Sequence, residues 1–208
     1  FVPVAKLGSG PNSLTVHPSV PATTVQELIA LMKAKPGQLI CGCAGVGSFQ
    51  HMGTERFKML TKTEFKILQF KGGGPAMIDQ LGGHSQLSFG SLIQTIPHVQ
   101  SGKFRILGTG GLKRINVLQN VPTIAETVPG YEATNWWGIV APAGTPAPVV
   151  AKLDKEIKTL LDSPDVQKLF AKEGADVDYL GPAEFGPFIE KEITKWGKVV
   201  KEANIQVK

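Results

Sequence analysis

Two glycine-rich junctions, each between a strand pattern and a helix pattern, constrain this chain most. The first is Cys41-Gly-Cys-Ala-Gly-Val-Gly-Ser-Phe-Gln-His51, and the second, further along the chain, is Phe70-Lys-Gly-Gly-Gly-Pro-Ala76. Glycines at such a junction let the backbone approach a ligand closely, and the following helix directs unpaired N–H groups and its positive dipole end at that ligand. Two such junctions in succession predict a pocket for an anion that backbone groups recognise.

Length and composition are those of a folded protein of one ordinary domain or two small ones. The chain has 208 residues, of which 42% are hydrophobic and 19% charged, so it is neither disordered nor fibrous. The net charge of +5 is compatible with acidic ligands. The lysines are scattered beside glutamates on amphipathic helix patterns, so we expect no nucleic-acid partner. No apolar run approaches the ~20 residues that span a bilayer, and we expect any signal peptide to precede Phe1.

The two cysteines give no sign of a disulfide or a metal. Cys41 and Cys43 lie two apart in a strand pattern, where side chains point in parallel and cannot easily be bridged. Two thiols without a His-x-x-x-His pattern are too few for a closed zinc site. We therefore predict no metal and no cofactor, and interpret both cysteines as small buried side chains.

Strand and helix patterns alternate with short turns, which favours an α/β fold with parallel strands flanked by helices. The expected strands are 13–17, 39–43, 65–70, 86–89, 104–109 and 135–140, and the expected helices are 24–36, 48–60, 75–81, 91–99, 148–161, 164–173 and 182–203. Pro97 should kink or shorten its helix. Residues 15–134 are expected to form one complete lobe (lobe two). Residues 1–14 and 135–208, a lead-in and a mostly helical tail, are expected to be the remnant of another (lobe one).

Further motifs follow one another in a fixed order. They are Leu14-Thr-Val-His-Pro-Ser-Val-Pro21, Leu81-Gly-Gly83, Val121-Pro-Thr123, Trp136-Trp-Gly138 and Ala141-Pro-Ala-Gly-Thr-Pro146. With the glycine junctions, this collinear set covers essentially the whole chain and resembles the extracytoplasmic solute receptors of tripartite tricarboxylate transporters, the Bug or tricarboxylate-receptor family.

The resemblance implies a type II periplasmic-binding-protein fold, in which two α/β lobes are joined by hinge strands, with lobe one incomplete in this chain. It also implies capture of a small organic acid in the periplasm of a Gram-negative bacterium, and delivery to the membrane permease subunits of the transporter. Di- and tricarboxylates, acidic amino acids and aromatic acids all remain candidate ligands. Because an incomplete lobe exposes sheet edge and apolar helix faces, we expect the chain to dimerise.

The resemblance places ligand binding on the glycine junctions. The implied residues are Cys43, Ala44, Gly45, Gly47, Ser48 and His51 from the first junction, Gly72, Gly73, Gly74, Pro75 and Ala76 from the second, and Ser91 from a third strand-to-helix junction. Ser48 is interpreted as a helix cap, alone or with a ligand contact. His51 is either a structural hydrogen-bonding group or a ligand contact. Cys43 stands where the family pattern commonly has serine, and a thiol is the weaker donor.

Two other functions remain open. The first is a small α/β enzyme in which Cys43 or Ser48 is a nucleophile that His51 activates, although no third group that would orient the histidine stands out. The second is the ligand-sensing module of a regulator. The chain has no helix-turn-helix segment and no basic stripe that would support it.

Overall fold

The computed structural model describes residues 1–206, which the contacts between residues divide into two compact units. Unit 1 comprises Phe1–Gly10 and Asn135–Lys198, and unit 2 comprises Pro11–Thr134 together with residues 199–206. The first observed boundary therefore lies between Gly10 and Pro11, earlier than the boundary after residue 14 that the sequence suggested.

Unit 2 is built on a mixed sheet of strand order β3-β2-β4-β1-β5. The strands are β1 (Val2–Val16), β2 (Ile40–Cys43), β3 (Lys66–Gln69), β4 (Leu87–Ser91) and β5 (Arg105–Thr109). β2 runs parallel to β3 and β4, as expected. β1 is antiparallel to β4 and to β5, which corrects the expectation of a parallel sheet. An antiparallel neighbour needs no helical crossover, so a strand from the chain's start can enter between β4 and β5.

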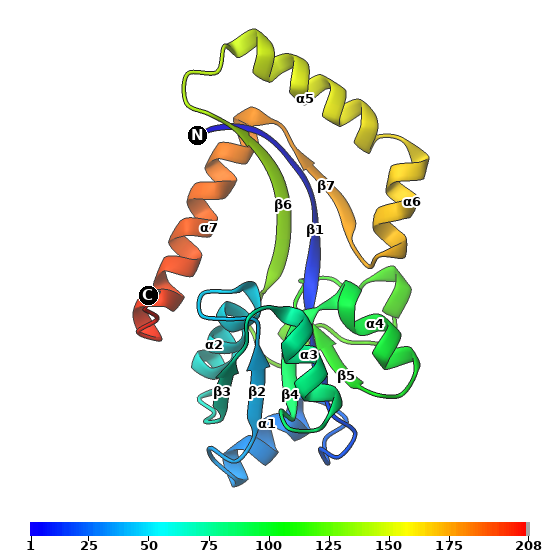
Figure 1. Ribbon diagram of the computed structural model, residues 1–208, viewed down its shortest axis with the longest axis vertical. Coiled ribbons are helices and arrows are strands. Elements are labelled where there is room, and N and C mark those ends of the chain that lie inside the picture. Colours follow the sequence, from blue (N-terminus) through cyan, green and yellow to red (C-terminus); the bar gives the residue numbers. More distant parts are fainter. Residues whose placement is uncertain (207–208) are drawn as a thin grey trace. The chain divides into compact units, whose positions relative to one another are not determined.

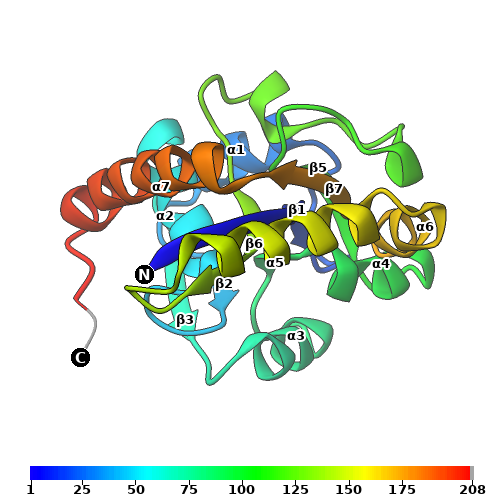
Figure 2. The ribbon, with the colours of Figure 1, turned by 90° about the horizontal axis from the view of Figure 1, so that it is seen from above.

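Helices cover both faces of this sheet (Figures 1 and 2). They are α1 (Val25–Ala34), α2 (Phe49–Thr61), α3 (Gly73–Leu81) and α4 (Leu92–Gln100). The predicted cap at Ser48 forms, because its hydroxyl accepts from the amide of His51 at 3.2 Å. Thr24 caps α1 in the same way, since its hydroxyl accepts from the amide of Glu27 at 3.1 Å. We expected Pro97 to kink or shorten its helix. α4 contains Pro97 and continues to Gln100, so the proline does not end the helix early.

The two faces of the sheet differ in chemistry. On the face of α1 and α2, the rings of Phe57, Phe89 and Tyr131 pack with centroids 5.1–6.1 Å apart. On the face of α3 and α4 the contacts are hydrogen bonds: the Ser13 and Thr95 hydroxyls lie 2.7 Å apart, and the Gln80 amide donates to the Thr15 carbonyl at 3.1 Å. The apolar face therefore forms the core of unit 2, and the polar face leads toward its junctions.

A buried asparagine fixes the start of β1 in unit 2. The Asn12 amide Nδ2 donates to the Tyr131 hydroxyl at 3.0 Å, and that hydroxyl donates to the Gly53 carbonyl at 3.3 Å. A Cβ at Gly53 would lie 2.6 Å from Asn12 Nδ2, and a Cβ at Gly110 would overlap Asn12 Oδ1. The asparagine therefore fits only because these two neighbours lack side chains.

Unit 1 pairs the first part of β1 with two later strands. They are β6 (Thr134–Ala141) and β7 (Asp176–Leu180), which pack with α5 (Ala147–Leu161), α6 (Pro164–Lys172) and α7 (Pro182–Glu202). β7 was not predicted, and it pairs antiparallel with β1, with Gly8 opposite Val177. The buried Lys6 ammonium pairs with the Asp178 carboxylate. Trp136 packs edge-on against Phe185, with ring centroids 5.6 Å apart.

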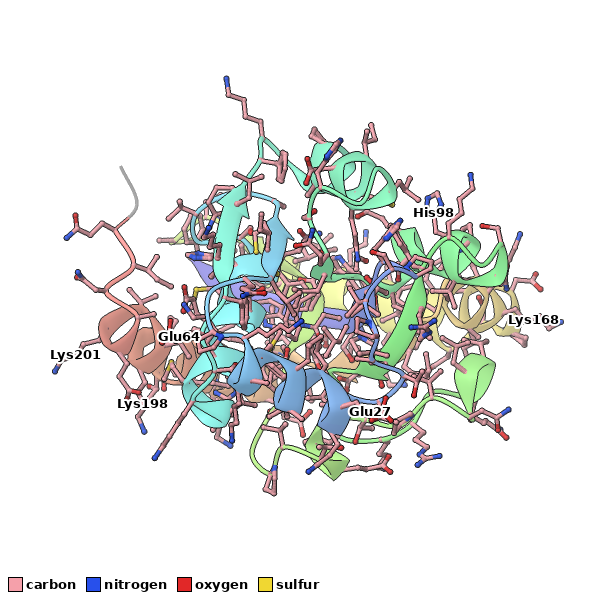
Figure 3. All side chains as sticks on the ribbon, turned by 90° about the horizontal axis from the view of Figure 1, so that it is seen from below. Glu27, Glu64, His98, Lys168, Lys198 and Lys201 are labelled. Carbon is pink, nitrogen blue, oxygen red and sulfur yellow. The ribbon has the colours of Figure 1, made fainter. Side chains whose placement is uncertain are left out.

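The scattered lysines lie on solvated helix faces. Lys168 on α6 and Lys198 and Lys201 on α7 are exposed, as is Glu27 on α1, and Figure 3 shows these side chains pointing outward from their helices. Among residues 1–206, no helix is both long and apolar enough to cross a membrane.

We expect Phe57→Ala to destabilise the protein by about 3–5 kcal/mol, because it removes a fully buried ring from the aromatic cluster and leaves a cavity. Urea unfolding followed by circular dichroism measures this loss. The matched control is Leu60→Ala on the same helix. Leu60 is 42% exposed, so its truncation should cost less than about 1 kcal/mol. Equal losses in the two variants would contradict the assignment of the core.

Candidate functional site

The candidate site lies at one edge of the unit 2 sheet. Because β3, β2 and β4 are parallel neighbours, their carboxyl ends meet at this edge, where each strand passes into a helix. These connections are the first junction (residues 44–48), the second junction (residues 70–72) and the third junction (residues 90–91). Cys43 and Cys41 face α2, whereas a Cβ at Gly42 would point toward α3. The helices that leave β2 and β3 thus lie on opposite faces, and such a point is where open α/β sheets bind ligands.

Backbone hydrogen bonds tie the first and second junctions together. The amide of Gly72 donates to the Ala44 carbonyl at 3.1 Å, and the amide of Phe70 donates to the Cys43 carbonyl at 2.8 Å. Gly45 has φ +120°, and a Cβ there would lie 3.2 Å from the Phe70 carbonyl oxygen. The first junction therefore needs glycine both for its backbone conformation and for this close approach.

Each junction presents unpaired N–H groups at a helix start. Within residues 1–206, no hydrogen bond involves the amides of Phe49 and Gln50 at α2, or those of Gly73 and Gly74 at α3. The Pro75 nitrogen carries no hydrogen. These are the donors that a helix leaves free in its first turn, and together with the helix dipoles they favour a negatively charged group.

A small cavity of about 10 Å³ lies between these helix starts, close to the minimum that holds one water molecule. Its lining residues are Gln50, Gly73, Met77, Gln80, Ser88, Gly90, Gln94 and Thr95. None of them is charged. A Cβ on Gly73 would lie 3.0 Å from Gln94 Oε1 and 3.3 Å from Gln50 Nε2, so the second junction directly adjoins both carboxamides.

Gln50 is the unusual member of this lining. Its side chain is 8% exposed, and its Oε1 atom is buried without a hydrogen-bond partner. An unsatisfied buried acceptor costs about 1–3 kcal/mol. Gln80, in the same cavity, is 1% exposed and bonds to Thr15 through both ends of its carboxamide. The Gln50 oxygen is therefore a buried acceptor without a donor among the described residues.

Cys43 and Cys41 lie inside the protein. Both residues are 0% exposed and both thiols are free. Their sulfurs lie 3.4 and 3.5 Å from the Thr54 hydroxyl on α2. Burial raises the pKa of Cys41, whereas the hydrogen bond from Cys41 lowers the pKa of Cys43. The sulfur of Cys43 thus packs against α2 rather than lining the cavity.

His51 and Ser48 are engaged within the first junction. The Gly47 amide donates to His51 Nδ1 at 3.1 Å, and His51 Nε2 lies 3.6 Å from Glu55 Oε1. Ser48 Oγ accepts the amide of His51, as a cap does. Ser91 begins α4 without a capping bond from its side chain. The structure therefore brings the first and second junctions together and places the third beside them through Gly90, which lines the same cavity.

Sequence reasoning missed Gln50, Ser88, Gln94 and Thr95. Gln50 lies two residues after the cap Ser48, and Gln94 three residues after Ser91. Polar side chains in the first turn after each junction were the available signal, since the first turn of each helix faces the same edge of the sheet.

Comparison with known proteins gives concordant matches. Residues 1–205 match the family described as tripartite tricarboxylate transporter family receptor. Protein BugT of Bordetella pertussis is 32% identical over 209 aligned residues, which cover 100% of this chain and 64% of BugT. Among solved structures, Rpa4515 of R. palustris with adipate is 34% identical with a TM-score of 0.90, over 99% of this chain and 69% of that one.

A second solved structure agrees. MatC of Rhodopseudomonas palustris with bound malate is 28% identical with a TM-score of 0.83, covering 96% of this chain and 69% of MatC. The chain thus spans somewhat less than two thirds of BugT and slightly more than two thirds of the two solved chains. These matches confirm the α/β fold of the type II periplasmic-binding-protein kind that the sequence resemblance implied.

We expect Gln50→Met to raise the free energy of unfolding by about 1 kcal/mol, because it replaces an unsatisfied buried carboxamide by an apolar side chain of similar length. The matched control is Gln80→Met, which breaks the bonds to Thr15 and should cost about 1–3 kcal/mol. Urea unfolding measures both. Equal destabilisation by the two substitutions would show that the Gln50 carboxamide is already satisfied in the free protein.

Proposed function

Because this chain belongs to the family of tripartite tricarboxylate transporter receptors, we propose that it captures a small organic carboxylate at the joined glycine junctions of unit 2. The observation that carries this proposal is the set of free helix N–H groups beside the neutral cavity that Gln50 lines. Capture would take place in the periplasm of a Gram-negative bacterium, followed by transfer to the membrane permease subunits.

Electrostatics favours a carboxylate over a neutral or cationic group. The starts of α2 and α3 each supply a positive dipole end, which stabilises an anion by about 0.3–1 kcal/mol, and charge-assisted N–H bonds add to this. The cavity lining carries no acidic side chain that would repel the anion and no basic one that would select by charge alone. A carboxylate would therefore be recognised by the amides of Gly73 and Gly74 and by the Nε2 group of Gln50, the donor end of that side chain, which lies toward Gly73.

The remaining residues of the proposed site have graded roles. Ala44, Gly45 and Ser48 would shape the first junction around the carboxylate, Gly72, Pro75 and Ala76 would shape the second, and Ser91 would extend the site along the third. Cys43 and His51 would support the first junction without contacting the ligand. The Cys43 thiol packs on Thr54, and the His51 imidazole accepts a hydrogen bond from the Gly47 amide.

The class of acid is proposed by analogy with relatives. Solved structures of similar proteins contain adipate in one case and malate in another. Both are dicarboxylates, so we propose a dicarboxylate whose first carboxylate binds at the junctions.

A dimer of this chain, expected from exposed apolar surface, also stays a prediction. Leu153, Leu160 and Leu169 are 43, 62 and 57% exposed.

The enzyme alternative has less support. The relatives are described as transporter receptors. Among the described residues, the partners of Cys43 Sγ are Cys41 and Thr54, and those of the His51 ring are Gly47 and Glu55. A nucleophile needs its base within hydrogen-bond reach. In the described part of the chain, no hydrogen bond joins Cys43 Sγ to the His51 ring.

We expect a dicarboxylate to raise the melting temperature of the 208-residue chain. At one hundred times its dissociation constant, a ligand adds about 2.7 kcal/mol of stability, which corresponds to roughly 5–10 °C for a chain of this size. The panel for differential scanning fluorimetry contains malate, succinate, adipate, aspartate, glutamate and citrate. Succinamide, in which neutral amides replace both carboxylates, is the control. A shift with succinamide as large as that with succinate would contradict anion recognition.

We expect Gly73→Val to abolish binding of malate and adipate, because the branched side chain would enter the space between Gln94 and Gln50. The matched control is Gly197→Val on α7, outside the proposed site. A Cβ at Gly197 meets no atom within 4 Å, so this variant should change affinity by no more than about twofold. Isothermal titration calorimetry measures both, and unchanged affinity in the Gly73 variant would remove the second junction from the site.

A further inference from the structure

His51 holds the first junction through one hydrogen bond that depends on its protonation state. The side chain is almost entirely buried, and its Nδ1 atom accepts the amide hydrogen of Gly47 at 3.1 Å. The amide of His51 in turn donates to Ser48 Oγ. The residue therefore contacts both the loop and the cap of α2, four positions after the glycine that it holds.

The identity of the donor fixes the tautomer. A backbone amide can only donate, so Nδ1 must carry a lone pair, and the proton of the neutral ring must lie on Nε2. Nε2 lies 3.6 Å from Glu55 Oε1, one turn further along the helix. In this state the imidazole is neutral, and both of its nitrogens have groups of the appropriate kind beside them.

We propose that His51 is a positioning residue whose neutral imidazole holds the first junction in its anion-binding shape through the Gly47 amide. Protonation of the ring would therefore weaken ligand binding. The inference rests on the proposed carboxylate function and adds to it a dependence on pH. Histidine is the side chain that ordinarily changes charge between about pH 5 and 8, so the test compares binding at the two ends of that interval.

The effect on the loop follows from the chemistry of imidazolium. A protonated ring has N–H groups at both nitrogens, so Nδ1–H would face the Gly47 N–H, and one of them must move. Gly47 has φ +75° and Gly45 has φ +120°, conformations that only glycine adopts readily. The junction therefore bends at these two residues, and its displacement would carry the Ala44 carbonyl away from the Gly72 amide that it holds.

Two charged side chains, one acidic and one basic, lie near the ring. Glu55 is the charged side chain facing the ring on α2, and Lys58 lies 3.9 Å from its other oxygen. A pocket of about 450 Å³ reaches the ring from the surface, and its remaining lining is uncharged: Val46, Gln69 on β3, and residues 203–206. Protons thus have access to His51. A protonated ring would pair with Glu55 Oε1, and we infer that loss of the Gly47 hydrogen bond outweighs the attraction of imidazolium for the ligand. Stronger binding of malate at pH 5.5 than at pH 8 would overturn this inference.

The decisive comparison uses two substitutions of His51. One keeps a hydrogen-bond acceptor but removes the group that can gain a proton, and the other removes the acceptor. His51→Asn keeps an acceptor, Oδ1, near the position of Nδ1 but carries no proton that titrates. His51→Leu keeps apolar volume and removes the acceptor. His84→Asn, at an exposed histidine after α3, controls for removal of a histidine as such. Calorimetric titration with malate at pH 8 and pH 5.5 gives the affinity of the four proteins.

We expect the wild type and the His84 variant to bind malate about five- to tenfold more weakly at pH 5.5 than at pH 8, which is the effect of losing one hydrogen bond. His51→Asn should bind at pH 8 and lose most of this pH dependence. His51→Leu should bind weakly at both values. Any titration of malate itself is common to all four proteins and cancels in the comparison.

A readout without ligand separates this inference from the proposed function. The amide resonance of Gly47 in ¹⁵N NMR spectra should shift strongly between pH 8 and 5.5 in the wild type and remain nearly constant in His51→Asn. If malate and the other acids fail to bind but this shift occurs, the proposed function fails and the switch in the loop stands. If the acids bind with the same pH profile in the wild type and in His51→Asn, or if the Gly47 resonance does not respond, the inference is overturned.

Discussion

Two backbone hydrogen bonds between neighbouring loops hold the candidate site together. The amides of Phe70 and Gly72 donate to the carbonyls of Cys43 and Ala44, so the parallel pairing of β2 with β3 continues beyond the ends of both strands. The starts of α2 and α3 are thereby fixed relative to each other. Recognition of an anion by two helix dipoles requires this fixed arrangement, since the contribution of each dipole falls off within the first turn.

The cavity beside the candidate site is lined without a basic side chain. Neutral carboxamides, hydroxyls and glycines line the cavity, and the helix amides supply the donors. A site of this kind imposes little preference on the part of the ligand that lies beyond the carboxylate. This fits a family in which one solved member contains adipate and another contains malate. Selectivity would then depend on residues that surround the remainder of the acid.

Local signals in the sequence predicted the local structure well. Ser48 was identified as a cap because capping depends on neighbouring residues alone, and the glycine junctions were recognised for the same reason. The first part of β1 and all of β7 were missed, because Pro3, Gly8 and Gly10 weaken the strand pattern and pairing between distant segments supplies the order. Gln50 was missed as well, since only the assembled sheet brings it beside Gly73 and Gly90.

The cluster around Asn12 has a consequence for sequence variation in this family. Gly53 lies in the middle of α2 and Gly110 follows β5, and neither has a positive φ. Turn geometry therefore gives no reason to retain them, and helix propensity argues against Gly53. The Asn12 carboxamide occupies the volume of both missing side chains, and a Cβ at Gly110 would also overlap the Ala133 carbonyl oxygen. Gly110 is therefore fixed by the backbone as well, whereas natural replacement of Gly53 should occur only together with a smaller residue at position 12, as a covarying pair of positions far apart in the chain.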